Sequence, residues 1–475
     1  MTVPRSILSP TLLPASIAIF TTVAIVAFEG LAITAALPEL AAELGDVELL
    51  PWVITSFLLA SAVATAVTGN FIDSLGTSAV FRWATVGFAV ASLIAAIAPS
   101  MGVLVASRVV QGISGGAIIS VGIAAVALVY PGHLTGRAFA ANSNVWGVLG
   151  FASPAIAAAM LEFGSWRWIF LVMVPICLVA LIAGWRTLPG AIQSSPLTID
   201  WTSAALLVLS VGLVLGAVSD ISMSSVYLLV AGAVFGFFLW RRSRRHPTPL
   251  VDPRFLRSHP YGHLAGAAGL TLAAMGGLSA YLPVFVRGAR GGSASLAAWS
   301  VLWLTIGWTL AANVAGRVTD RVSERSVLTV GVFIGPLAIA AAWLSVVLEA
   351  PLPVVFAAYF VMGTSVGTVT NASLQLVRRA VPDNLAGRAT SAHAFMRTMG
   401  LSVGAGLAGG VILAVVATRI SDISQVREAL AGEATGLSGP AALALADGFG
   451  MAHLVAFGLM AGAVTVVMSM RRHHL

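Results

Sequence analysis

The chain has 475 residues, of which 58% are hydrophobic and only 9% are charged. Because a soluble domain usually carries about 25% charged residues, this composition excludes a water-exposed globular protein and indicates that lipid is the main solvent. The formal net charge is +7, and arginine is the only strongly basic residue type in the chain, which has no lysine. In a membrane protein such an excess marks cytoplasmic loops rather than a nucleic-acid-binding surface.

Apolar stretches of about 18 residues or more recur along the chain, each long enough to cross a hydrocarbon core of about 30 Å. Backbone polar groups must be satisfied within such a segment, so the predicted fold class is all-α integral membrane. The first run is too long for the apolar part of a signal peptide and contains Glu29, so we expect a retained helix. We place fourteen transmembrane helices at 12–37, 51–71, 80–98, 102–129, 138–161, 168–186, 203–219, 225–241, 262–286, 296–316, 327–347, 353–376, 390–417 and 448–470.

Loop charges support this number of helices. With the N-terminus inside, the even-numbered loops are cytoplasmic and hold most of the arginines, among them Arg82, Arg137 and Arg388. The opposite loops carry mostly acids such as Glu43 and Asp220. If one helix were missing, the alternation of arginine-rich and acidic loops would be reversed in the rest of the chain. The charge distribution therefore favours an even number of spans, with both termini on the cytoplasmic side of the cytoplasmic membrane.

The two halves of the chain repeat one another. Residues 69–73, read as following the second helix, share the pattern G-x-x-x-D with residues 316–320 after the tenth. Residues 131–138 match 382–389, and at that offset Gly112 and Gly116 fall on Gly363 and Gly367. Leu37-Pro38 ends the first predicted helix much as Leu282-Pro283 ends the ninth.

The repeat predicts an N-terminal six-helix bundle at 1–190 and a C-terminal six-helix bundle at 259–475. Residues 191–258 then form two inserted transmembrane helices and a cytoplasmic linker. Duplicated helical bundles that face one another across a central site are the usual architecture of secondary transporters.

These motifs resemble those of the major facilitator superfamily, in particular its fourteen-helix drug:proton antiporter branch. Residues 69–76 resemble the loop motif after helix 2, and 104–112 resemble the helix 4 signature l-x-x-x-R-x-x-q-G. Glu29 precedes Pro38 by the spacing of the branch's helix 1 motif, and 165–170 resemble the segment that opens helix 6. The resemblance implies the major-facilitator fold and proton-coupled transport of small molecules.

The chain departs from the branch at three places. Thr77-Ser78 replaces the basic pair of the first loop motif, and the helix 1 acid is glutamate rather than aspartate. The helix 5 motif, normally G-P-x-x-G-G, reads S-P-A-I-A-A from Ser153. Small residues are kept, so close helix approach is still expected. We assign this helix 5 motif to Gly147, Gly150 and Pro154.

Two charged residues are the candidates for proton coupling. Glu29 lies deep in a predicted membrane helix, where a carboxylate is costly unless it is protonated, paired or hydrated, and therefore indicates function. The second half has no acid at the equivalent place, around Ala274 and Met275. The resemblance implies a proton-relay role for Arg108. The alternative is that both residues are structural. Glu29 would then be hydrogen-bonded to neighbouring helices, and Arg108 would bond helix carbonyls or snorkel to the membrane surface.

Further candidates fall into two groups. By resemblance, the acid of the first loop motif locks the two bundles closed on the cytoplasmic side, and this predicted conformational switch comprises Gly69, Asp73, Gly76, Arg82, Arg137, Asp320 and Arg388. Polar residues that match between helices 5 and 13, together with others on helices 4, 10 and 12, are candidates for a substrate cavity: Gln111, Asn142, Trp146, Asn313, Asn371, Gln375, His393 and Arg397. Trp303 and Trp308 are predicted to form either an aromatic wall of the cavity or membrane-interface contacts.

The sequence therefore predicts a proton-coupled antiporter that exports amphipathic drugs or metabolites, and not an enzyme. No phosphate-binding loop, H-E-x-x-H motif or cysteine cluster is present, so we expect no ATP, cofactor or metal site. The expected partners are a small amphipathic molecule, protons and membrane lipid, without nucleic acid, and the expected state is a monomer. A lipid, siderophore or nutrient carrier on the same fold, or a non-transporting membrane protein, remains as the alternative.

Overall fold

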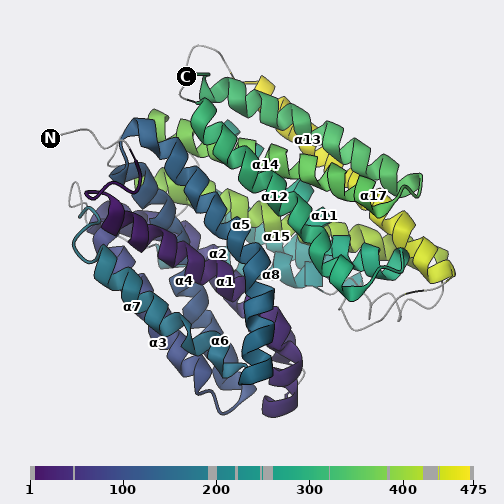
Figure 1. Ribbon diagram of the computed structural model, residues 1–475, viewed down its shortest axis with the longest axis horizontal. Helices are drawn as coiled ribbons and strands as arrows, with labels where there is room; N and C mark the ends of the chain where they lie inside the picture. The colour runs from purple at the N-terminus through teal and green to yellow at the C-terminus, as the bar shows by residue number, and fades with distance from the viewer. Residues whose placement is uncertain are drawn as a thin grey trace. The chain divides into compact units, whose positions relative to one another are not determined.

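The computed structural model describes residues 6–46, 49–190, 200–219, 223–246, 249, 260–319, 321–381, 386–420, 437 and 439–470. Within these ranges the chain is almost entirely helical and contains no β-strand (Figure 1). Each range predicted as a membrane helix overlaps an observed helix, and the sixth is divided into two consecutive helices.

The helices follow in one order along the chain. The N-terminal part contains α1 (Leu13–Leu44), α2 (Leu50–Leu75), α3 (Thr77–Ala96), α4 (Met101–Val129), α5 (Gly132–Phe163), α6 (Arg167–Leu171) and α7 (Met173–Gly184). The middle contains α8 (Trp201–Ser219) and α9 (Met223–Ser243). The C-terminal part contains α11 (Tyr261–Val284), the π-helix η2 (Phe285–Ala289), α12 (Ala294–Val318), α13 (Glu324–Val347), α14 (Leu352–Ala380), α15 (Ala386–Arg419) and α17 (Pro440–Met468).

Ten helices of the described chain are long and apolar enough to cross a membrane, and Leu13–Glu29 and Trp201–Val214 are shorter apolar helices. The number of fourteen spans therefore stays a prediction. The chain forms two compact units. The first comprises Met1–Gly212, Val234–Ser258 and Val377–Phe395, and the second comprises Leu213–Ala233, His259–Leu376 and Met396–Leu475. The predicted domain boundaries also stay predictions.

Several predicted helix ends were wrong. Proline was expected to end the first and ninth helices, but α1 continues through Pro38 to Leu44, and Pro283 lies inside α11. A proline removes only one backbone hydrogen bond, which a long membrane helix tolerates. Asp73 was expected in a loop, but it lies in the last turn of α2, because the helix continues until Gly76. Gly76 has φ +84°, a conformation that favours glycine.

The internal repeat extends to side-chain packing. In the first unit, a Cβ added to Gly112 or Gly116 of α4 would collide with the carbonyls of Phe57 and Ser61 on α2. In the second unit, a Cβ added to Gly363 or Gly367 of α14 would collide with the carbonyls of Leu304 and Trp308 on α12. These are equivalent positions, because the offset that matches Gly69 with Gly316 also matches Phe57 with Leu304 and Ser61 with Trp308. Both units therefore use the same glycine-mediated helix contact.

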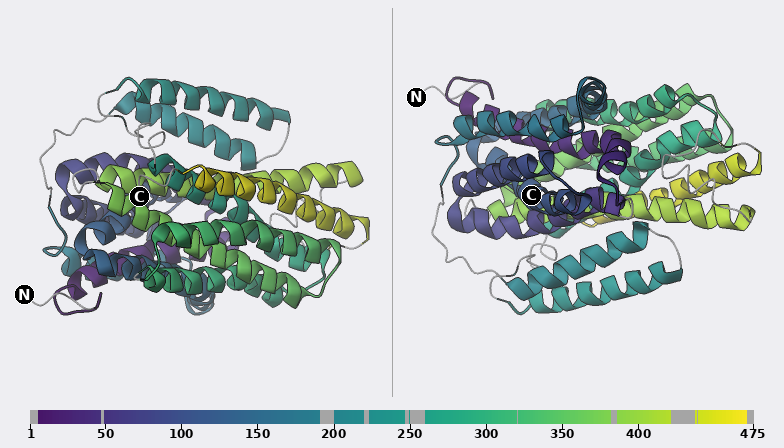
Figure 2. Two further views of the ribbon diagram at one scale, coloured as in Figure 1. Left: turned by 90° about the horizontal axis from the view of Figure 1, so that it is seen from above. Right: turned by 90° about the horizontal axis from the view of Figure 1, so that it is seen from below.

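The inserted helices α8 and α9 lie side by side as a pair (Figure 2). Asp200 fixes one end of this pair. Its carboxylate accepts from the Ser203 backbone N–H at 3.1 Å, which caps the first turn of α8, and from Arg242 Nε of α9 at 2.9 Å. Although its burial acts to raise the pKa of Asp200, the hydrogen bonds from Arg242 and Ser203 hold that pKa well below its usual value. Asp200 was not among the residues that the sequence analysis selected.

Candidate functional site: a buried ion pair in the first helical unit

Glu29 of α1 and Arg108 of α4 form an ion pair through Glu29 Oε1 and Arg108 Nη1. Both side chains are buried, with exposed fractions of 0% and 1%. The sequence placed each charge in a membrane helix but did not establish that they touch. Taking two charges out of water is costly, and the pair persists only if its geometry and further hydrogen bonds offset that cost.

Arg108 has partners on several helices. Its Nε donates to the Val53 carbonyl of α2 at 2.8 Å, and its Nη1 donates to Gln111 Oε1 at 3.0 Å. Gln111 Nε2 in turn donates to Ser92 Oγ of α3 at 2.9 Å. The guanidinium also lies 4.4 Å from the centre of the Phe57 ring. Residues of α1, α2, α3 and α4 therefore fix the orientation of this one arginine.

Glu29 is held differently from Arg108. Apart from the ion pair with Arg108, neither carboxylate oxygen has a hydrogen-bond partner among the described residues. The charge of Glu29 therefore depends on one counterion, whereas Arg108 has several partners. Because a protonated carboxyl is neutral, a proton that arrives at Glu29 would replace this single interaction without breaking other hydrogen bonds.

Gln111 was predicted to line a substrate cavity. The structure places it one helical turn from Arg108, fully buried and bonded to Arg108 and Ser92. The spacing of three residues on α4 could have indicated this contact. The sequence did not indicate Ser92 or Val53 as partners in this site, because Ser92 is one of several serines in apolar helices and Val53 contributes only its backbone carbonyl.

The residues predicted as a conformational switch lie in different places: some are inside helices, one is exposed, and some are outside the described residues. Arg82 Nε donates to the Ser78 carbonyl at 3.2 Å, and its guanidinium lies 5.2 Å from the centre of the Trp185 ring. Gly69 and Asp73 lie inside α2, and Arg137 is exposed on α5. Asp320 and the side chain of Arg388 lie outside the described residues. Their joint role in a switch stays a prediction.

Three predicted cavity residues of the second unit lie on α12 and α14. Gln375 Nε2 donates to Asn371 Oδ1 at 2.5 Å, and Asn371 Nδ2 donates to the Ala312 carbonyl of α12 at 3.3 Å. Gln375 Oε1 accepts from Thr319 Oγ1 at 3.3 Å. Asn313 donates to the Thr309 carbonyl of its own helix at 2.7 Å. The bonds of Asn371 with Ala312 and of Gln375 with Thr319 connect α14 to α12 and its C-terminal end.

The other predicted cavity residues lie on α5 and α15. Asn142 is partly exposed and Trp146 is 38% exposed, while His393 is buried and Arg397 is partly exposed. Gly147, Gly150 and Pro154 all lie within α5, and the side chain of Pro154 is outside the described residues. A common substrate cavity for these residues stays a prediction.

The aromatic wall of Trp303 and Trp308 also stays a prediction. Trp303 of α12 is 43% exposed and stacks on Phe356 of α14, with ring centres 6.3 Å apart. Trp308 is partly exposed. No group of three or more residues that could hold a metal ion occurs in the described part of the chain.

Sequence reasoning missed a second buried polar pair. Tyr359 of α14 and His453 of α17 are both fully buried, and Tyr359 Oη lies 3.2 Å from His453 Nε2. His453 Nδ1 lies 2.8 Å from the Phe449 carbonyl. Tyr359 occupies the position equivalent to Arg108, at the offset that matches Gly112 with Gly363. The repeated position therefore carries Arg108, which forms an ion pair, in the first bundle, and Tyr359, which contacts a histidine of α17, in the second.

Helical bundles built from a repeat, with an acid and an arginine buried in one of them, define a membrane transporter of the duplicated-bundle class. The family comparison agrees. The profile of the Major Facilitator Superfamily matches residues 18–405, most of the chain. The chain therefore belongs to this superfamily of multi-pass membrane transporters.

Individual relatives share moderate identity with this chain. The transporter YebQ of Escherichia coli is 33% identical over 213 residues, which cover 43% of this chain and 46% of YebQ. The match thus spans less than half of that relative. Multidrug resistance protein 3 of Bacillus subtilis is 24% identical over 422 residues, covering 83% of this chain and 78% of that protein. The crystal structure of the human organic anion transporter MFSD10 has a TM-score of 0.64 at 17% identity, covering 95% of this chain and 100% of that one, which shows the shared fold.

Proposed function

We propose that the protein is a proton-coupled secondary transporter that exports amphipathic small molecules across the cytoplasmic membrane by alternating access. The buried Glu29–Arg108 pair is the observation that carries this proposal, because a protonatable acid in an apolar bundle is the group that a proton-driven cycle needs. Similarity to a relative named as a multidrug resistance protein supports the substrate class. The proposal places both termini in the cytoplasm.

The asymmetry of the two bundles supports the role of Glu29. At the places that correspond to the ion pair, the second bundle has Ala274 near the Glu29 position and Tyr359 at the Arg108 position. A contact needed only for packing would be expected in both copies, as the glycine contacts are. A single titrating site instead suits a device that binds one proton per cycle.

In the proposed cycle, a proton from outside neutralises Glu29, weakens its attraction to Arg108 and permits substrate release. Return to the inward-open state and loss of the proton to the cytoplasm restore the ion pair. One pH unit supplies about 1.36 kcal/mol per proton, and 100 mV supplies about 2.3 kcal/mol per charge. Together these support a gradient of roughly 500-fold for a neutral substrate exported with one proton.

The test is transport by purified protein in proteoliposomes with an imposed pH gradient and a panel of amphipathic cations. Glu29→Gln should abolish uphill transport while it retains downhill exchange of the same compound, since a neutral amide mimics the protonated acid. Asp447→Asn is the matched control, because Asp447 is a surface acid that is 51% exposed. Uphill efflux by Glu29→Gln at the wild-type rate would reject the assignment.

A further inference from the structure

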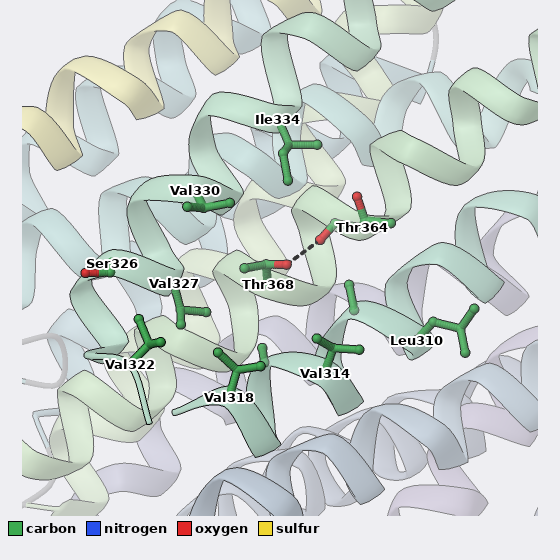
Figure 3. Close-up of a pocket in the computed structure, with 12 residues that line it drawn as sticks. Leu310, Val314, Val318, Val322, Ser326, Val327, Val330, Ile334, Thr364 and Thr368 are labelled. Atoms are coloured by element: carbon green, nitrogen blue, oxygen red, sulfur yellow. Dashed lines mark hydrogen bonds between the residues drawn. The ribbon is translucent and has the colours of Figure 1, made fainter. Parts of the chain in front are cut away.

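A groove lies along α12, α13 and α14 of the second unit. Its volume is about 440 Å³, and Figure 3 shows Leu310 and Thr364 at one end and Val318, Val322 and Ser326 at the other. Eight residues of α12 separate Leu310 from Val318, which corresponds to a length of about 12 Å. The groove therefore extends over about two turns of α12.

The groove is lined mainly by apolar side chains, several of which are exposed at the surface of the protein. Val314 of α12 and Val330 of α13 both line it (Figure 3) and are 58% and 57% exposed. The hydroxyls of Thr364 and Thr368 donate to carbonyls of their own helix at 2.7 Å. Because these hydroxyl donors already bond their own helix, the groove has few groups that could hydrogen-bond a polar ligand. Its apolar surface instead suits a hydrocarbon chain.

Positive charge lies at one end of the groove. Arg317 is one turn beyond Val314 on α12, and Arg321 directly precedes the lining residue Val322. Both arginines are exposed, and neither has an ion pair or side-chain hydrogen bond with any residue in the described ranges. The neighbouring Glu324 is buried, and Arg325 donates to the Met470 carbonyl at 2.6 Å.

We propose that this groove binds an anionic phospholipid of the cytoplasmic leaflet, with one acyl chain along α12 and α13 and the phosphate on Arg317 and Arg321. An apolar groove with two exposed arginines beside one end, neither partnered by a side chain among the described residues, matches a molecule with a hydrocarbon tail and a charged head. Arginine clusters at the cytoplasmic end of membrane helices attract anionic headgroups. The site lies within the second unit and does not depend on proton coupling.

The test measures lipid binding to purified full-length protein by native mass spectrometry. Phosphatidylglycerol and phosphatidylcholine with identical dioleoyl chains are titrated separately. We expect phosphatidylglycerol to bind more tightly to the wild type. The variant Arg317→Gln/Arg321→Gln should weaken that binding by at least about fivefold, the effect expected for one arginine near an anionic headgroup.

Two further variants separate headgroup from acyl-chain recognition. Arg241→Gln/Arg245→Gln removes the same charge from two exposed residues, one in the last turn of α9 and one just beyond it, and should change binding less than twofold. Val330→Phe fills the groove without changing charge and should also weaken binding of phosphatidylglycerol, whereas Val347→Phe, at an exposed α13 position outside the groove, should not.

Several results would overturn the proposal. These are equal affinity for both lipids, equal losses in the two arginine double variants, or unchanged binding to Val330→Phe. Full displacement of phosphatidylglycerol by inorganic phosphate at millimolar concentration would also overturn it, because the acyl chain would then contribute nothing. A variant counts only if it elutes as the wild type does and keeps its helical circular dichroism.

Discussion

Glu29 and Arg108 form a buried ion pair in which the two side chains are held unequally. Arg108 is tied to Val53 and Gln111 as well as to Glu29, so its position is fixed even when the acid changes its charge. Among the described residues, Glu29 has Arg108 as its one partner. In the proposed cycle, this difference would let the acid take up a proton while the hydrogen bonds of Arg108 stay in place.

We expect substitutions of Glu29 and Arg108 to affect the stability of the protein and its uphill transport differently. Glu29→Gln alone should destabilise the protein by about 3–5 kcal/mol, because it leaves a buried guanidinium without a counterion. Adding Arg108→Gln should recover at least half of that loss but none of the uphill transport. Thermal unfolding in detergent and transport in proteoliposomes measure the two quantities. Equal unfolding temperatures for the single variant and the wild type would contradict the prediction.

Glu43 allows a prediction of pH dependence outside the membrane-spanning segments. It accepts from Arg167 Nη1 at 2.5 Å and from Trp166 Nε1 at 2.7 Å. The hydrogen bond from Arg167, followed by that from Trp166, lowers the pKa of Glu43. A lowered pKa means that the charged form is stabilised by folding, so this contribution is complete above the ordinary carboxyl pKa and is lost as the pH falls through the folded-state value.

We therefore expect the difference in unfolding temperature between wild type and Glu43→Gln to be constant from about pH 6 to 8 and to shrink below about pH 4.5. Arg167→Gln should move this loss to higher pH. Since the Glu43 side chain is 49% exposed, the difference itself should be small. A difference that grows on acidification would show that the sign is wrong.

At the scale of elements, glycine decides how closely neighbouring helices approach. Gly116 of α4 lies against the Ser61 carbonyl of α2, and the equivalent Gly367 of α14 lies against the Trp308 carbonyl of α12. Gly122 on the same α4 is different, since a Cβ there would make an ordinary contact of 3.4 Å with Val23.

Gly116→Ala and Gly367→Ala should therefore each destabilise the protein by about 1–3 kcal/mol, because a methyl group would push the two backbones apart. Gly122→Ala is the control and should be neutral or slightly stabilising, since it improves helix propensity without a collision. Unfolding temperature in detergent gives the comparison. Similar losses for Gly116→Ala and Gly122→Ala would mean that close packing is not the cause.

Helix positions were predictable from the sequence, but several helix ends were not. Hydropathy falls where a segment leaves the hydrocarbon, and this placed the predicted ends of α1 and α2 too early. A helix does not stop at the membrane surface, because its own hydrogen bonds continue in water. The end of α2 is set by the backbone of Gly76, whose N–H bonds to the Ile72 carbonyl at 2.8 Å.

At the scale of the whole molecule, the fourteen-span topology is the prediction to test. Cys177 is the only cysteine, so Cys177→Ser gives a background for single-cysteine labelling. In intact cells, Asp46→Cys and Asp220→Cys should react with a membrane-impermeant maleimide, because the loop charges place them outside. Arg137→Cys and Arg321→Cys should react only after permeabilisation. Labelling of Asp220→Cys only from inside would show that α8 and α9 do not form a pair of spans.

The sequence by itself determined the helical membrane class, the repeat and the family, because hydrophobic length, loop charge and spaced glycines are properties of the chain alone. It also singled out Glu29 and Arg108 as costly charges. Only the tertiary structure decided that these two touch, that Gln111 bonds both Arg108 and Ser92, and that Tyr359 and His453 form a second pair. Such contacts join helices that are distant in sequence, and their partners depend on how each helix is rotated, which hydropathy does not encode.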